Sequence, residues 1–118
     1  DVATAGGESV SLRIAARIRE WGASLGNVGA VVGATYPAQM AAIRAALPDA
    51  ALLVPGIGTQ GGDLEASVRA GMDGHRAGML ISSSRSVLYA SSGDDFAEAT
   101  RAEALRLRDA INRVRFGD

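Results

Sequence analysis

The sequence predicts an α/β fold built on a parallel sheet. Three short apolar runs, Val28–Ala34, Leu52–Val54 and Met79–Ile81, are each bounded by glycine, proline or serine and are typical of buried strands. Segments with apolar residues at helical spacing lie before, between and after them. Strands that alternate with helices in this way form βαβ units, and their strands lie parallel.

Four segments carry the helical pattern, and local signals mark their ends. Pro37 suits a first helical turn, Asp63 is a predicted N-cap and Gly71 a predicted C-cap. Acidic residues open the last segment and arginines close it, as the helix dipole favours. The predicted helices are Ser9–Trp21, Pro37–Leu47, Asp63–Ala70 and Asp95–Val114.

Three strands form an incomplete sheet. A parallel sheet is covered on both faces or closed into a barrel, and three strands achieve neither while leaving two unpaired edges. We therefore expect residues 1–118 to be one unit that belongs to a larger sheet.

Composition narrows the class of protein. The chain has 118 residues, 47% hydrophobic and 21% charged, as in an ordinary globular domain, and no apolar run is long enough to span a bilayer. A net charge of −1 argues against binding to nucleic acid or to a membrane surface. The absence of cysteine excludes disulfides and thiolate catalysis and fits the cytoplasm. All 12 basic residues are arginine, so no lysine chemistry can be completed by this chain alone.

The richest segment for chemistry is Pro55–Asp63, PGIGTQGGD, between a predicted strand and a predicted helix. Its glycines allow the backbone to approach a ligand closely, and the helix start offers free N–H groups to an anion. Gly56–Gly61 also matches the dinucleotide fingerprint G-x-G-x-x-G, although no acidic residue ends the next strand. Phosphate is the predicted ligand, with a ligand-free turn as the simpler alternative.

The segment Ser82–Ser86, SSSRS, follows the last predicted strand. Arg85 presents a planar fork of donors that matches phosphate oxygens, beside the glycine-rich loop of the preceding strand. In a TIM barrel the phosphate site is commonly built from the last two such loops. The alternative is a surface arginine in a serine-rich loop, and an NADP site is a further alternative because Arg85 could meet a 2′-phosphate.

Three other residues have simpler interpretations. Thr35 is expected to cap the helix that begins near Pro37, and Trp21 is expected to pack against the core. His75, the single histidine, lies in the polar segment before the last strand and is interpreted as a solvated loop residue.

Three motifs in register resemble orotidine 5′-monophosphate decarboxylase of the longer bacterial type. They are VVGATYP at Val31–Pro37, LLVPGIGTQGGD at Leu52–Asp63, and LISSSR at Leu80–Arg85 followed by LYA. The resemblance implies the C-terminal part of a TIM (β/α)8 barrel, about strands 6–8 with their helices. It also implies a homodimer, an orotidine or uridine monophosphate ligand, no cofactor, and an N-terminal half of the barrel supplied elsewhere.

The resemblance also assigns roles to residues. Gln60, Ser84 and Arg85 would hold the substrate phosphate, Ser84 and Arg85 partly through backbone N–H groups, while Pro55 and Ile57 would line the pyrimidine pocket. The Asp–Lys–Asp constellation that performs decarboxylation is absent from this chain, which has no lysine. Ser86-Val87 stands where relatives tend to have Gly-Ile. A non-catalytic half-barrel that associates with itself remains an alternative function.

Overall fold

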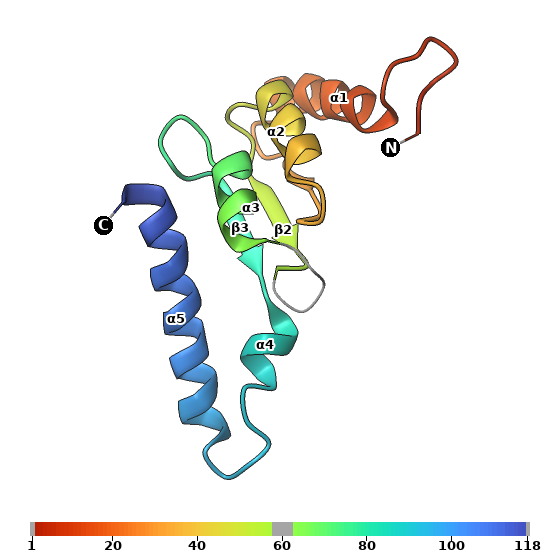
Figure 1. Cartoon of the computed structure of the whole chain (residues 1–118). Helices are drawn as coiled ribbons and strands as arrows, with labels where there is room; N and C mark the ends of the chain where they lie inside the picture. The colour runs from red at the N-terminus through yellow and green to blue at the C-terminus, as the bar shows by residue number, and fades with distance from the viewer. Residues whose placement is uncertain (1, 58–62, 118) are drawn as a thin grey trace.

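The computed structural model describes residues 2–57 and 63–117 and has a three-stranded parallel sheet as its centre. The strands β1 (Ala30–Val31), β2 (Leu52–Pro55) and β3 (Met79–Ser82) lie in chain order. The described residues also form five helices, which leave one face of the sheet uncovered (Figure 1). They are α1 (Val10–Leu25), α2 (Pro37–Ala46), α3 (Leu64–Gly71), α4 (Ser84–Leu88) and α5 (Phe96–Phe116).

One face of the sheet forms the core with α2 and α3. Leu52 and Val54 of β2 are fully buried, and they pack with Met40 of α2, Ala34 and Ile57. Val68 of α3 is buried as well. The two buried residues of β2, Leu52 and Val54, are two positions apart, as the two-residue period of a strand requires.

The other face of the sheet is open. Leu53 pairs in register with Val31 on one side and Leu80 on the other, and the three side chains are 40%, 70% and 65% exposed. The prediction of buried strands therefore holds for the face that packs on α2 and α3 and is wrong for this row. The exposed row is the side of a sheet that would line the inside of a barrel, where neighbouring strands fill the space.

Most helix signals in the sequence act as predicted. Asp63 caps α3 by accepting the N–H of Ala66, and Pro37 occupies the first turn of α2. Gly71 is the last residue of α3 and Met72 takes the C-cap position, one residue later than predicted. The first strand, Ala30–Val31, is shorter than predicted, although the backbone N–H groups of Val32 and Ala34 still donate to Leu53 and Pro55 of β2.

One expectation about the helices is wrong, and one helix was not predicted. Trp21 is 54% exposed and does not pack into the core, since the only buried residue of α1 is Ala15. Helix α4 was not predicted, because five residues are too few to show helical periodicity. None of the helices within the described residues is long and apolar enough to cross a membrane.

Candidate functional site at the carboxyl ends of β2 and β3

Two neighbouring strands end side by side at the candidate site. Pro55 of β2 is in register with Ser82 of β3, so the segments that follow them leave the sheet at the same edge. These segments enclose a cavity of about 130 Å³. Its lining consists of Pro55, Gly56, Ile57, Ser82, Ser83, Ser84 and Arg85. Gly56 has φ +90°, a conformation that glycine adopts without strain, and this turns the chain at the cavity wall.

Arg85 supplies the positive charge at this cavity. It lies in the first turn of α4, is exposed, and its guanidinium has no hydrogen-bond or ion-pair partner among the described residues. An arginine whose five donors have no internal acceptor is available to an external anion. Helix α4 adds the backbone N–H groups of its first turn, beginning at Ser84.

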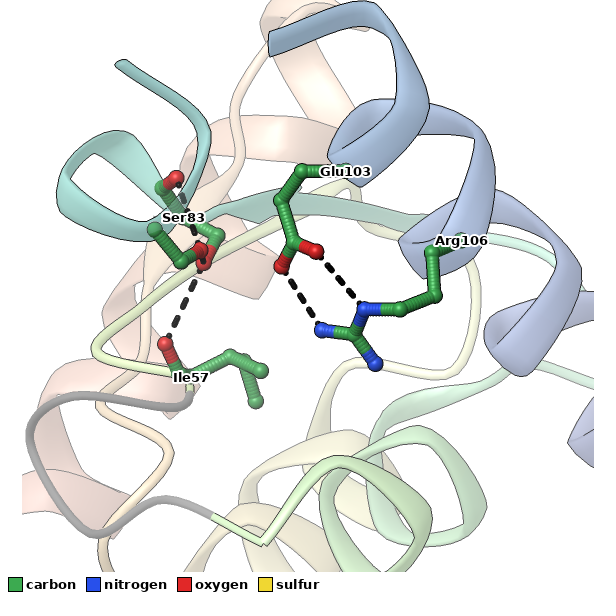
Figure 2. A network of polar contacts seen from close by, with 5 residues as sticks. Ile57, Ser83, Glu103 and Arg106 are labelled. Carbon is green, nitrogen blue, oxygen red and sulfur yellow. Dashed lines mark hydrogen bonds and ion pairs between the residues drawn. The ribbon is translucent and has the colours of Figure 1, made fainter. Parts of the chain in front are cut away.

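A pair of serines joins the two walls of the cavity. The Ser83 hydroxyl donates to the carbonyl oxygen of Ile57 at 3.3 Å, and the Oγ atoms of Ser83 and Ser86 lie 2.7 Å apart (Figure 2). Ser83 is also the N-cap residue of α4. Sequence reasoning missed this contact. The available signal was Ser83 followed by Ser86 three residues later, the spacing that brings side chains together across one helical turn.

A second polar pair appears in the same view (Figure 2). Glu103 of α5 accepts two hydrogen bonds from Arg106, both of 2.7 Å. The hydrogen bonds from Arg106 lower the pKa of the Glu103 carboxyl, and the same pairing raises the pKa of Arg106. The Glu103 carboxylate is therefore paired with an arginine of the same helix.

The structure brings four of the five predicted site residues to one cavity. Pro55, Ile57, Ser84 and Arg85 all line it, while Gln60 lies outside the described residues. Ile57 is a lining residue of the cavity and also belongs to the hydrophobic core, with the residue only 3% exposed. The roles assigned to these residues in substrate binding stay predictions.

Two other residues singled out in the sequence, Thr35 and His75, lie outside the cavity. Thr35 does not cap α2, because Tyr36 is the N-cap residue and makes no side-chain capping hydrogen bond, so that prediction was wrong. His75 is exposed in the loop that precedes β3, at the opposite end of the strand from the cavity, as the interpretation of a solvated loop residue requires. No group of three or more His, Cys, Asp or Glu side chains that could hold a metal occurs within the described parts of the chain.

The amino ends of the strands hold a buried arginine that the sequence did not reveal. Arg44 of α2 is 7% exposed, and desolvation by burial lowers its pKa although Asp73 and Asp49 oppose this. Its guanidinium donates to backbone carbonyl oxygens of Gly71, Leu47, Pro48, Ala50 and Gly78, at 2.7 to 3.3 Å. Arg44 therefore joins the ends of α2 and α3 to the loops before β2 and β3.

Comparisons with known proteins identify what these segments resemble. No protein-family model matches the chain. A curated relative from Azoarcus sp. (strain BH72), named orotidine 5′-phosphate decarboxylase, is 55% identical over 111 residues. These residues cover 93% of this chain and 41% of the relative. A relative with the same name from Thermomicrobium roseum is 51% identical over 92% of this chain and 39% of its own length. The chain thus spans about two fifths of the length of these relatives.

Solved structures give the same result. Leishmania donovani OMP decarboxylase matches with a TM-score of 0.80 and 38% identity, over 96% of this chain and 41% of that one. Leishmania donovani UMP synthase matches with a TM-score of 0.73 and 36% identity, over 99% of this chain and 27% of that one. The match confirms the predicted fold class, part of a TIM barrel. Over nearly its whole length, the chain is therefore similar to the C-terminal part of the orotidine 5′-phosphate decarboxylases, as its three motifs predicted.

Proposed function

We propose that this chain forms the phosphate-binding part of an orotidine 5′-phosphate decarboxylase, the enzyme that converts orotidine monophosphate to uridine monophosphate and carbon dioxide. The observation that carries the proposal is Arg85, an exposed cation without an internal partner, at a cavity between the carboxyl ends of two parallel strands. In TIM barrels the active site occupies that end, and phosphate binds at the last two strand-to-helix loops.

In this proposal the residues divide the work of binding. Arg85 donates to the phosphate oxygens and the backbone N–H groups at Ser84 and Arg85 assist, while Gln60 is assigned on the resemblance alone. Pro55 is half-buried at the same cavity and, together with Ile57, lines the pyrimidine side. Binding energy gained at the phosphate, remote from the reacting carbon, holds the ring in a closed, desolvated site.

The proton donor and its carboxylates come from the part of the barrel that this chain does not contain, since the chain has no lysine. The reaction requires no cofactor in this proposal. In this proposal the complete enzyme is a homodimer, as the resemblance implies. It works in the cytoplasm, which fits the absence of cysteine from this chain. Residues 1–118 act in it as one unit rather than as two domains.

The test is reassembly of the barrel. This chain is co-expressed with the N-terminal part of the Azoarcus relative that it does not cover, and decarboxylation is followed by the change in pyrimidine absorbance. We expect turnover from this pair, called here the reassembled enzyme, and none from either part alone. A stable, well-folded pair that leaves orotidine monophosphate unchanged would contradict the proposal.

Arg85→Ala in the reassembled enzyme should raise KM for orotidine monophosphate by about 10- to 100-fold, because a charge-assisted hydrogen bond contributes about 1.5–3 kcal/mol. Arg85→Lys should have a KM between that of the wild type and that of Arg85→Ala, since an ammonium keeps the charge without the fork of donors. Arg13→Ala, which removes an exposed arginine from α1, is the matched control and should retain wild-type kinetics. Equal effects of the two alanine variants would argue against the assignment of Arg85.

A further inference from the structure

The Ser83 hydroxyl continues the contact between β2 and β3 beyond the end of the sheet. The backbone pairing of the two strands stops at Pro55 and Ser82, and Pro55 has no N–H to donate. One residue later, the side chain of Ser83 donates to the Ile57 carbonyl oxygen, 26 residues away in the sequence. This bond joins the segment that opens the glycine-rich loop to the segment that opens α4.

Three contacts link the two serines to each other and to Ile57. The Ser83 hydroxyl donates to the Ile57 carbonyl oxygen at 3.3 Å, the two Oγ atoms lie 2.7 Å apart with either able to donate, and Ser86 Oγ lies 3.5 Å from the Ser83 carbonyl oxygen. A serine hydroxyl has one proton to donate and can accept two. When Ser83 donates to Ile57, Ser86 is the donor in the 2.7 Å contact, and Ser86 thereby orients the Ser83 hydroxyl toward Ile57.

We propose that Ser83, oriented by Ser86, is a positioning residue that sets the spacing between the two walls of the phosphate cavity. This rests on the proposed function. Both walls are needed for a two-sided grip, and both walls meet at this bond: Ile57 on one side, and the residue immediately before Ser84-Arg85 on the other. Without the hydroxyl, the backbone N–H groups and Arg85 keep their chemistry but lose their fixed distance from the opposite wall.

Ser86 supplies the second hydroxyl of this contact. It lies one helical turn after Ser83, where its Oγ is 2.7 Å from that of Ser83. Loss of the Ser86 hydroxyl removes its contacts with the Oγ and the carbonyl oxygen of Ser83 and leaves the Ser83–Ile57 hydrogen bond in place. Ser86→Ala should therefore have a smaller effect than Ser83→Ala, in the same direction.

The experiment compares affinity for uridine monophosphate with affinity for uridine, measured calorimetrically in the reassembled enzyme. Because uridine lacks the phosphate, the ratio of the two dissociation constants isolates the phosphate grip. We expect Ser83→Ala to weaken the binding of uridine monophosphate by about 3- to 10-fold and the binding of uridine by less than about 2-fold. The effect is modest because a hydroxyl hydrogen bond of 3.3 Å is long and therefore weak. Ser83→Thr, which keeps the hydroxyl, should restore most of the ratio.

Ser92→Ala is the matched control, because Ser92 is an exposed serine in the loop after α4 and lies outside the cavity. It should leave both affinities unchanged. Parallel weakening of both ligands by Ser83→Ala, or an unchanged ratio, would overturn the positioning role. Failure of the proposed function is seen separately, as a wild-type protein that binds uridine monophosphate no better than uridine, and it would remove the basis of this inference too.

Discussion

At the scale of single residues, Arg44 shows how a buried cation can be satisfied without a hydrogen bond to a carboxylate. Its hydrogen bonds all go to backbone carbonyl oxygens, two of them on Gly71 and Gly78, which are 27 and 34 residues away. Burial opposes the charged form and lowers the pKa, while the charges of Asp73 and Asp49 act in the other direction. The hydrogen bonds to carbonyl oxygens satisfy the buried donors. Arg44 therefore stabilises the end of the sheet opposite the candidate site.

Arg44→Ala should lower the free energy of unfolding of the reassembled enzyme by about 3 kcal/mol or more, because it leaves several partly buried carbonyl groups without a donor. Arg44→Lys should recover only part of this loss, since an ammonium cannot span the same acceptors. Urea denaturation measures the effect, with the exposed Arg13→Ala as control, expected within about 0.5 kcal/mol of wild type. A loss below about 1 kcal/mol for Arg44→Ala would show that water replaces the guanidinium.

At the scale of elements, the loop between α3 and β3 is shaped by one carboxylate. Asp73 accepts the backbone N–H of Ala77 at 2.9 Å and of His75 at 2.8 Å, and these bonds, that from Ala77 first, hold its pKa below the ordinary value. Gly78, with φ +77°, closes the loop, and a Cβ there would approach the Asp73 carboxylate to 2.6 Å. The glycine is therefore required both by its conformation and by the close approach.

This loop predicts an acid sensitivity with a definite sign. Because the pKa of Asp73 is lower in the folded state, its stabilising contribution is present above the unfolded value of about 4 and is lost as pH falls through the folded value. Tm of the wild type should therefore fall more steeply below about pH 4 than Tm of Asp73→Asn, which cannot be protonated. Parallel curves from pH 6 to pH 3 would mean that the carboxylate charge contributes nothing to the loop.

Helix α5 illustrates an element with an unfinished surface. Its apolar stripe includes Leu107, Ile111 and Val114, which are only half-buried, and the helix contains no buried residue. Figure 1 shows it as a long helix that runs beside α3 and α4. A stripe of this length indicates that further structure packs against it in the complete barrel.

At the scale of the whole molecule, the chain has the shape of a part rather than of a self-contained domain. Its radius of gyration is 16.1 Å, whereas a compact chain of this length has about 13–14 Å. The principal extents are 55 × 29 × 28 Å, and the open row of Val31, Leu53 and Leu80 runs along one face of the sheet. An apolar surface of this kind marks an interface.

Leu80→Asp should prevent reassembly with the N-terminal part while leaving the core of this chain intact, because Leu80 is 65% exposed here and would lie inside the closed barrel. We expect at least a 10-fold loss of complex, measured by size-exclusion chromatography of the co-expressed parts. Phe116→Asp, a similarly exposed apolar residue at the end of α5, is the control and should assemble as the wild type does. Equal assembly of both variants would place the interface elsewhere.

The sequence by itself determined the order of the strands and of all helices except α4, the first turn of α2 at Pro37, the cap at Asp63, and the position of Arg85 beside the segment that follows the preceding strand. These features depend on local spacing and residue chemistry, so they can be read without coordinates. Only the tertiary structure decided that Ile57 turns its side chain into the core, that Ser83 joins the two walls of the cavity, and that Arg44 is buried. Each of these depends on contacts between residues far apart in the chain, which the packing of βαβ units brings together and no local pattern records.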